Sequence, residues 1–181
     1  MGNDDLNPGS ILFRNRIIFL FGPIDQDTAR DIIPRLLVMN SLGTEPIKLF
    51  INSPGGESAA GLAIYDTMRF IQAPVYTICI GQAASMATWL LAAGAKGNRV
   101  ASENAQIMIH QGRTLMGGTY ADLKISMEEF DRIHQRMINI LSRHTGKDTS
   151  EIAKSIDRDY WMTPQEALEF GIIDKVVSTP D

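Results

Sequence analysis

Apolar residues recur along the chain with two spacings, and the two spacings alternate. Runs rich in β-branched and other apolar residues predict strands at 11–21, 48–52, 75–80, 99–101, 106–109 and 172–177. Apolar residues at helical spacing predict helices that begin near residues 27, 57, 85, 120, 148 and 163. Strands that alternate with helices predict the α/β class.

Two helical segments carry features that bear on the architecture. Pro34 falls inside the first helical pattern, so we expect that helix to be kinked there or to begin later. The segment Tyr120–His144 predicts one long helix that projects from the body and buries an apolar stripe against a partner; the alternative is a long helix within the domain. The stripe consists of Leu123, Met127, Phe130, Ile133, Met137, Ile140 and Leu141. Residues 111–120, with three glycines, predict a mobile loop or loose strand before it.

Length and composition narrow the class of protein. A chain of 181 residues predicts one domain, 1–181, and residues 1–10 predict a flexible start. The net charge of −4 argues against a nucleic-acid partner. A single cysteine, Cys79, favours a reducing compartment and, inside an apolar run, a buried structural thiol. With no signal peptide and no run of membrane-spanning length, we expect a soluble intracellular protein that binds no membrane.

Ser85 follows a predicted buried strand and begins a predicted helix. A hydroxyl exposed at such a turn suits a nucleophile, and the helix N-terminus favours developing negative charge. The surrounding residues 81–87 do not form the G-x-S-x-G elbow of α/β-hydrolases. On local grounds alone a plain helix N-cap serine is the more common arrangement.

His110 ends an apolar strand beside the glycine-containing segment and suits a general base, with a hydrogen-bonded structural histidine as an equal alternative. His134 and His144 lie on the long predicted helix, where solvated or capping roles fit. Asp157 and Asp159 precede an aromatic pair, and either could orient a base. The local sequence does not choose between these two aspartates.

A second turn, Ser53-Pro54-Gly55-Gly56, follows the predicted strand at 48–52. Two glycines free the backbone to present N–H groups to an oxyanion, and a tight turn without function is the alternative. No Lys-Ser/Thr follows, so the turn is not a Walker loop. No cluster of histidines, cysteines and carboxylates has metal spacing, and we expect no metal or other cofactor.

Taken together, these runs are similar to the Clp protease proteolytic subunit (ClpP) family, peptidase type S14. The similarity covers about residues 12–178, nearly the whole chain. The matching runs are 51–56, 60–61, 64–68, 81–87, 91–94, 107–111, 157–159 and 166–167, with Gly171 and Asp174.

The resemblance implies a serine endopeptidase with Ser85 as nucleophile, His110 as base and Asp159 as orienting acid. It assigns the oxyanion hole to the backbone amides of Gly56 and Met86. It also implies a ClpP/crotonase-like spiral of strand-helix repeats with a protruding handle at about 111–145. Two stacked heptameric rings (a tetradecamer) would enclose the sites, and an AAA+ Clp ATPase would feed in unfolded polypeptide. A bacterial cytoplasm is the expected compartment, with an organelle matrix or stroma also compatible.

The chain departs from the family pattern at four places. Few residues precede Ile11, so reduced axial loops and altered ATPase coupling are expected. Pro34 is unusual in the first helix. The segment after His110-Gln111 has Gly112 and Arg113 where the family typically has proline.

The fourth departure concerns the pocket on which the ATPase docks. Lys48 stands where the family usually has an aromatic residue, although Phe50 and Phe70 keep aromatic character nearby. These departures favour a divergent paralogue that works in a mixed complex, either as a partner-dependent or as a non-catalytic ring subunit. The retained serine, histidine and aspartate argue against the non-catalytic form. A crotonase-fold acyl-CoA enzyme is a further alternative, and it leaves those three residues unexplained.

Overall fold

A computed structural model describes residues 7–178. Seven helices and seven strands occur in this range, in the order α1 (Pro8–Arg14), β1 (Ile17–Phe21), α2 (Gln26–Leu42), β2 (Ile47–Ser53), α3 (Ser58–Phe70), β3 (Val75–Ala84), α4 (Met86–Ala92), β4 (Arg99–Ser102), β5 (Gln106–Ile109), α5 (Tyr120–Thr145), α6 (Thr149–Ser155), β6 (Tyr160–Met162), α7 (Pro164–Phe170) and β7 (Lys175–Val177).

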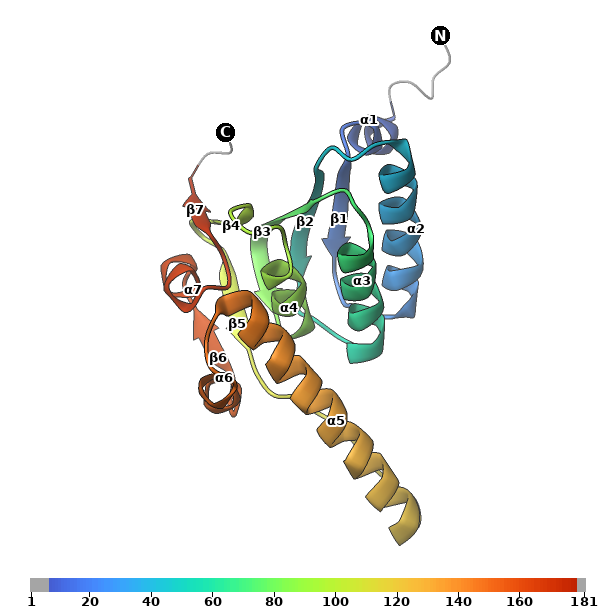
Figure 1. The fold of residues 1–181 in the computed structure, drawn as a ribbon, viewed down its shortest axis with the longest axis vertical. Coiled ribbons are helices and arrows are strands. Elements are labelled where there is room, and N and C mark those ends of the chain that lie inside the picture. The colour runs from blue at the N-terminus through green and yellow to red at the C-terminus, as the bar shows by residue number, and fades with distance from the viewer. Residues whose placement is uncertain (1–6, 179–181) are drawn as a thin grey trace.

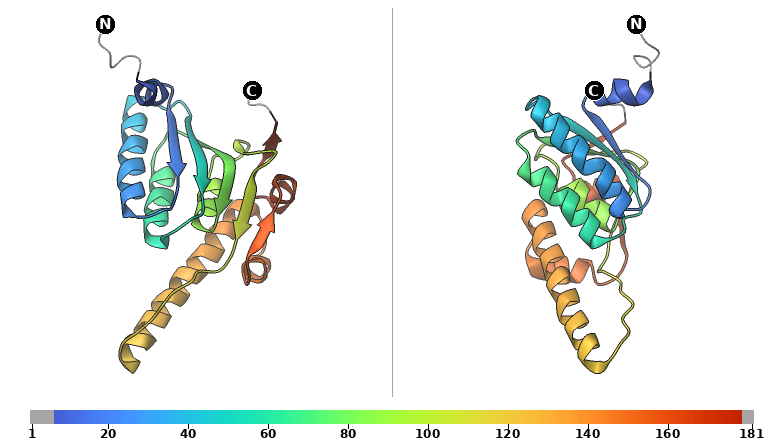
Figure 2. Two further views of the ribbon diagram at one scale, coloured as in Figure 1. Left: turned by 180° about the vertical axis from the view of Figure 1, so that it is seen from behind. Right: turned by 90° about the vertical axis from the view of Figure 1, so that its right-hand side faces the viewer.

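One sheet organises these elements. Its main path is β1-β2-β3-β4-β7, with all neighbours parallel, and β5 pairs with β3. The short β6 pairs with β5 in the antiparallel sense. Helices α2, α3 and α4 lie on one face of the sheet (Figures 1 and 2). The α/β class predicted from the sequence is therefore confirmed.

The alternation of residues along each element accounts for this layering. In β2, every second side chain from Ile47 to Ser53 is buried and the intervening ones are not. In α2, the buried positions Ala29, Ile32, Leu36 and Met39 follow helical spacing. These faces meet in one hydrophobic cluster between the sheet and the helices.

Pro34 does not delay the start of α2, so that part of the sequence prediction is wrong. Asp25 caps the helix, with its Oδ1 accepting a hydrogen bond from the Thr28 amide at 2.8 Å, and the helix then runs through Pro34. Pro34 lies on the exposed side, while Ile32 and Leu36 are buried against the core. Packing of the apolar face therefore outweighs the hydrogen bond that proline removes.

The first predicted strand is also wrong over its first half. Residues Pro8–Arg14 form α1, which begins with a proline at its first turn and an Asn7 cap, and only Ile17–Phe21 is extended. The expected flexible start covers residues 1–6, which lie outside the described residues, Asn7, which caps α1, and residues 8–10, which belong to α1.

Strand β3 continues beyond the turn predicted at Gly81 and ends at Ala84. The pairing with β2 shifts register there, from Ile51 opposite Cys79 to Ser53 opposite Ala83. Gly81 has a φ of 80°, so this glycine serves a bulge inside the strand and does not end it. Cys79 is fully buried in β3, and burial raises the pKa of its thiol to about 12, as a structural thiol requires.

The long helix α5 projects from the body, as the sequence predicts (Figure 1). A capping box between Thr119 and Asp122 begins it, and Gly146 ends it in the left-handed conformation. Its buried residues, Ile138, Ile140 and Leu141, all lie near its C-terminal end. Among the described residues, no helix is long and apolar enough to cross a membrane.

Arg99 joins the ends of three helices. Its guanidinium is buried and pairs with Asp174 at 2.6 Å, and its Nη1 also reaches the carbonyl oxygens of Ala92, His144 and Gly171. These three residues lie at or next to the C-terminal ends of α4, α5 and α7. A buried cation here is compensated by one carboxylate and three carbonyl dipoles.

Arg99→Leu should lower the free energy of unfolding by about 3–5 kcal/mol, because it leaves the Asp174 carboxylate unpaired in a largely buried place. Urea unfolding at equal protein concentration measures the loss. Arg30→Leu is the matched control, since Arg30 pairs with Asp27 on the exposed surface and should cost less than about 1 kcal/mol. Equal losses of unfolding free energy in the two variants would contradict a stabilising role for the buried Arg99–Asp174 pair.

His144 packs against Tyr65, whose hydroxyl lies 3.0 Å from His144 Nε2. Burial, and then the charges of Arg69, Arg99 and Arg143, lower the pKa of His144 from 6.5 to about 4. A histidine whose pKa is lower in the folded state takes up its proton more readily when unfolded. Its contribution to stability is therefore complete above pH 6.5 and is lost as the pH falls toward 4.

Between pH 6.5 and pH 4, we expect this histidine to account for a loss of roughly 2 kcal/mol in the free energy of unfolding, after allowance for its partial exposure. The measurement is the urea midpoint across this pH range for the parent protein and His144→Gln. Glutamine cannot titrate, so the variant should show a flatter profile. Two parallel profiles would show that His144 is not the titrating group.

Candidate active site

The predicted site residues converge where several strands end. Strands β2 and β3 are parallel neighbours, with Ser53 opposite Ala83, and β3 pairs with β5, with Ala84 opposite Met108. The carboxyl ends of parallel strands lie at one edge of a sheet, where α/β proteins commonly place their sites. The register therefore brings the Ser53–Gly56 turn, Ser85 and His110 to one edge.

Ser85 occupies a sharp turn between β3 and α4. Its φ is 53°, one of two positive values among the described non-glycine residues, and its amide donates to the Met108 carbonyl at 2.9 Å. Thr88 Oγ1 lies 2.8 Å from the Ala83 carbonyl oxygen and 2.7 Å from the Met108 carbonyl oxygen. These two contacts fix the conformation of the turn. The backbone cost of the turn is of the kind found at functional sites.

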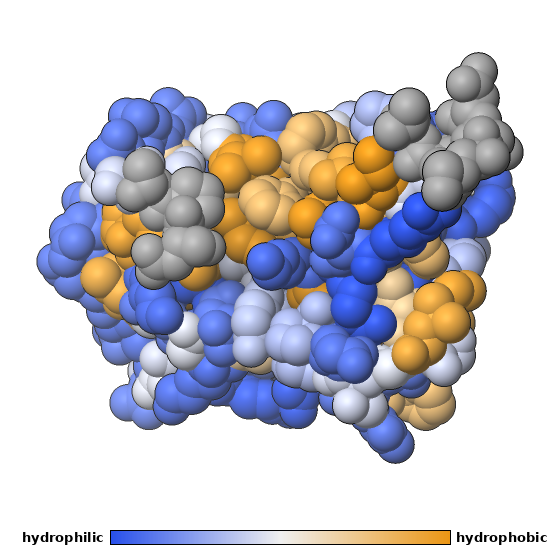
Figure 3. All heavy atoms as spheres, turned by 90° about the horizontal axis from the view of Figure 1, so that it is seen from above, coloured by the Kyte–Doolittle hydropathy of each residue, from blue (hydrophilic) through white to orange (hydrophobic). Residues whose placement is uncertain are grey.

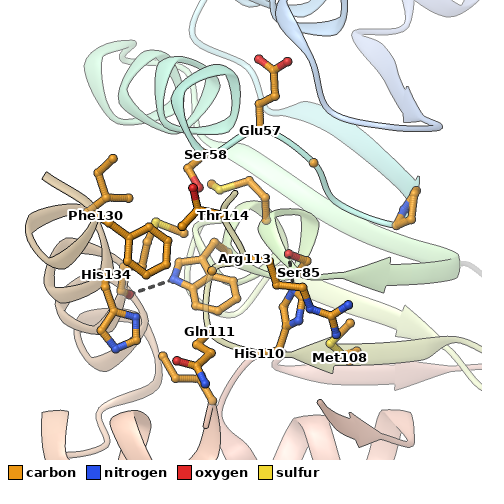
Figure 4. Close-up of a pocket in the computed structure, with 18 residues that line it drawn as sticks. Glu57, Ser58, Ser85, Met108, His110, Gln111, Arg113, Thr114, Phe130 and His134 are labelled. Carbon is orange, nitrogen blue, oxygen red and sulfur yellow. Dashed lines mark hydrogen bonds between the residues drawn. The ribbon is translucent and has the colours of Figure 1, made fainter. Parts of the chain in front are cut away.

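The Ser85 hydroxyl does not cap the helix, although Ser85 stands at the N-cap position of α4. Its Oγ lies 2.8 Å from His110 Nε2 instead, a hydrogen bond drawn in Figure 4. The geometry thus separates the two interpretations that the sequence leaves open for this serine. The residue starts the helix, and its side chain is directed at a histidine.

Asp159 meets the other ring nitrogen of His110. In the antiparallel pair of β5 and β6, Ile109 lies opposite Tyr160, so the next positions outward, His110 and Asp159, face each other. His110 Nδ1 lies 3.0 Å from Asp159 Oδ1. The structure brings Asp159 to His110 and not Asp157, whose carboxylate lies 3.6 Å from Arg158.

The carboxylate of Asp159 is partly open to solvent and is shared. Its side chain is 43 % exposed, against 13 % for His110. Arg113 Nη2 lies 2.9 Å from Oδ1 and 3.1 Å from Oδ2. The hydrogen bond from Arg113, with a smaller one from His110, lowers the pKa of Asp159 against the opposing effect of desolvation. The group therefore stays ionised at neutral pH.

The two glycines after β2 let their turn pack against the Ser85 elbow. Gly55 has a φ of 86°, and a Cβ there would lie 2.6 Å from the Ser85 Cβ. Gly56 packs against the backbone of Ile24, and a Cβ would collide with it. A side chain at Gly55 would push the turn away from Ser85, and one at Gly56 would push it away from Ile24.

A pocket of about 420 Å³ opens beside Ser85 (Figure 4). Its walls come from the turn after β2, from α4, from the segment after β5 and from the base of the projecting helix. The apolar lining residues are Met86, Trp89, Met108, Phe130, Ile133, Met137 and Ile156. Trp89 Nε1 donates to the Met137 carbonyl at 2.8 Å, which ties α4 to α5 at the pocket wall.

The residues assigned to ATPase docking lie apart from this pocket. Lys48 and Phe50 share one face of β2, and Phe70 is the exposed last residue of α3. Phe19 and its neighbour Phe21, which the sequence did not single out, join them: Phe19 lies opposite Phe50, with ring centroids 5.7 Å apart. Figure 3 shows hydrophobic side chains gathered between hydrophilic ones on the end of the molecule that it views.

Two features of the site are absent from the sequence prediction. Strand β6, which aligns Asp159 with His110, is only three residues long and gives too short a pattern to detect. The contact of Arg113 with Asp159 joins residues 46 apart in the chain. A charged residue at an unusual place after His110-Gln111 is the one signal that pointed toward it.

Comparison with known proteins agrees with this geometry. The family model for Clp protease matches residues 2–180. The chain is 44 % identical over 169 residues to the ATP-dependent Clp protease proteolytic subunit of Deinococcus radiodurans, covering 93 % of this chain and 83 % of that protein. It is 46 % identical over 179 residues to proteolytic subunit 2 of Mycobacterium leprae, covering 97 % and 84 % of the two chains.

A third relative is proteolytic subunit 1 of Mycolicibacterium paratuberculosis, 45 % identical over 179 residues, covering 97 % of this chain and 85 % of that protein. The resemblance inferred from the sequence is thereby confirmed. These matches extend over nearly all of the chain, including the turn after β2, the Ser85 elbow and β6. The chain belongs to the Clp protease family, a family of peptidases.

Proposed function

We propose that the chain is the proteolytic subunit of an ATP-dependent Clp protease and that it hydrolyses peptide bonds as a serine endopeptidase. The observation that carries the proposal is the hydrogen-bonded line from Ser85 Oγ to His110 Nε2 at 2.8 Å and from His110 Nδ1 to Asp159 Oδ1 at 3.0 Å. A nucleophile, a base and an orienting carboxylate in this order are the parts that acyl transfer by serine needs.

The reaction begins when Ser85 Oγ attacks the carbonyl carbon of a peptide bond. His110 Nε2 takes the hydroxyl proton as the new C–O bond forms. The ionised Asp159 accepts from Nδ1–H, which fixes the imidazole tautomer and stabilises the imidazolium. Collapse of the tetrahedral intermediate breaks the C–N bond, and Nε2–H protonates the leaving amine. Water, activated by the same imidazole, then hydrolyses the acyl-enzyme and releases Ser85.

The backbone amides of Gly56 and Met86 are the proposed oxyanion hole. Met86 is the first residue of α4, so its N–H has no acceptor within the helix. Both residues line the pocket that contains Ser85. A preorganised donor of this kind contributes about 3–4 kcal/mol to transition-state stabilisation.

The pocket beside Ser85 is the proposed site for the substrate side chain next to the scissile bond. Trp89, Met108 and Met137 give it apolar walls, which favour apolar substrate residues. An unfolded polypeptide supplies such residues in extended form, whereas a folded protein keeps them buried.

Assembly into two stacked heptameric rings is part of the proposal, with residues 1–181 as one domain and a handle at about 111–145. The apolar side chains Ile125 and Met127 are more than half exposed on α5. Exposed apolar side chains of this kind favour burial against another subunit. Clp ATPases are the partners of this family, and Lys48, Phe50 and Phe70 are the proposed docking residues. The aromatic cluster of Phe19, Phe21 and Phe50 supports an apolar contact on that face.

A second candidate is a subunit that is active only inside a mixed ring. The segment 111–119 favours it, because this segment follows His110 directly and carries no regular secondary structure of its own. Contacts from a neighbouring subunit would then be needed to fix the segment beside the site.

A fluorophosphonate serine probe tests the proposal on the purified protein, with mass spectrometry to identify the labelled residue and sizing to measure assembly. Labelling at Ser85 that Ser85→Ala abolishes is the expected result. An oligomeric sample without labelling would refute a self-sufficient peptidase. Labelling that returns when a paralogous subunit is added would favour the mixed ring.

A further inference from the structure

Arg113 is a charged residue that the proposed mechanism does not use. It is in direct contact with Asp159, the last member of the Ser85–His110–Asp159 line. It lies three positions after His110 and lines the same pocket (Figure 4). Its Nη2 bridges the two carboxylate oxygens of Asp159, at 2.9 Å and 3.1 Å. The same Oδ1 is the one that lies against His110 Nδ1.

This contact compensates for the solvent exposure of the Asp159 carboxylate. The carboxylate that orients a catalytic histidine is ordinarily buried, which keeps water from competing for it. Asp159 is 43 % exposed and stands just before a three-residue strand, so little packing limits its rotation. A guanidinium nitrogen held on both oxygens restricts that rotation and keeps Oδ1 directed at His110.

The neighbouring arginine does not provide the same contact. Arg158 precedes Asp159 in the chain, but its Nη1 donates to the Asp157 carbonyl at 2.8 Å and lies 3.6 Å from the Asp157 carboxylate. Of these two arginines near the site, Arg113 is therefore the one placed to act on Asp159.

We propose that Arg113 is a positioning residue of the peptidase site, which holds the Asp159 carboxylate against His110 Nδ1. The inference rests on the proposed serine mechanism. With Oδ1 held on Nδ1–H, the imidazole stays in the tautomer whose Nε2 can accept the Ser85 proton.

The position of Arg113 also depends on the handle. Segment 111–119 runs outward from the site to the tip of α5 (Figure 2). A Cβ at Gly112 would lie 3.3 Å from the Phe130 ring of α5, so the backbone beside Arg113 rests on that helix. A shift of the handle would therefore move the Arg113 guanidinium relative to the Asp159 carboxylate.

The test is the separate measurement of kcat and KM for a small fluorogenic peptide, made on assembled parent protein, Arg113→Gln and Arg113→Lys. Other charged or titratable groups face the site and remain in every variant, namely Glu57 and His134 at the pocket and Asp157 and Arg158 beside Asp159. Differences in kcat between the variants thus report on Arg113. Arg30→Gln, at an exposed pair on α2, is the control for loss of one arginine.

Arg113→Gln should lower kcat/KM at neutral pH about three- to tenfold, through kcat and not through KM, because the substrate contacts stay and only the alignment of the base is lost. Arg113→Lys keeps the charge but replaces the rigid guanidinium with a flexible ammonium, so kcat should fall here as well, with KM near that of the parent.

Labelling of Ser85 by the serine probe separates the two proposals. If Ser85 is labelled in the parent and Arg113→Gln keeps kcat within twofold of the parent, the role of Arg113 is overturned. An equal loss of kcat in Arg30→Gln would overturn that role as well. If Arg113→Gln fails to assemble, a parent-like kcat in assembled Arg113→Lys overturns the role. Absence of labelling in the assembled parent would overturn the serine mechanism itself.

Discussion

Ser85→Ala should lower the rate of peptide hydrolysis by roughly 10⁴- to 10⁶-fold, because alanine removes the atom that forms the acyl bond. The His110 ring and the Asp159 carboxylate keep their places, since Ser85 contributes only one hydrogen bond to them. The measurement is turnover of a small fluorogenic peptide by assembled protein, with the urea midpoint recorded in parallel. A residual rate within about tenfold of the parent would show that another group is the nucleophile.

The backbone at this position supplies a matched control. Ser85 holds a φ of 53° and a ψ of −132°, a conformation that costs a residue with a Cβ more than it costs glycine. Ser85→Gly should therefore be equally inactive and yet more stable than Ser85→Ala by about 1 kcal/mol. Such a gain would show that the elbow is strained in order to present the hydroxyl. An equal or lower stability for the glycine variant would remove that interpretation.

The sequence could predict most of the elements because their signals are local. The capping box of Thr163 and Glu166, with Pro164 at the first helical position, marks the start of α7, and Gly171 ends it in the left-handed conformation. Helix α5 follows from a long apolar stripe. The expectation that fails for α2 is the effect of Pro34, because the buried face of this helix carries it through the proline.

The site itself depends on strand register, which a single sequence does not contain. Local residues allow Ser85 to be a cap and allow either Asp157 or Asp159 to orient a base. Opposition of Ile109 and Tyr160 across β5 and β6 makes the choice, because it sets Asp159 opposite His110. The family resemblance indicated the same residues. The site residues of the family already reflect this strand register, although the resemblance does not show how the register arises.

Contacts between exposed side chains are the hardest to foresee. Arg113 lies in a segment without regular structure, and its side chain is 74 % exposed. Hydrophobic patterning says nothing about where such a group points. The departure from proline to Gly112-Arg113 drew attention to the place, and only the folded chain shows the partner, Asp159.

Asp159→Asn should lower kcat/KM by about 10²- to 10⁴-fold, and Asp157→Asn by less than about threefold. An asparagine has one side-chain oxygen, and Arg113 competes with His110 for it. With its oxygen on Arg113, the asparagine turns its NH₂ toward His110 Nδ1, which must then accept a hydrogen bond. The single N–H proton of the neutral imidazole is then on Nε2, so this nitrogen cannot accept the proton of Ser85.

The two variants change the same kind of group two positions apart, so each controls for the other. Both should be measured as assembled protein with the same fluorogenic peptide, and circular dichroism should show equal secondary structure. Arg113→Gln combined with Asp159→Asn should recover part of the loss, because the asparagine oxygen is then free to face Nδ1. Equal losses at Asp157 and Asp159 would mean that the contact at 3.0 Å does not orient the base, and the site would need another acid.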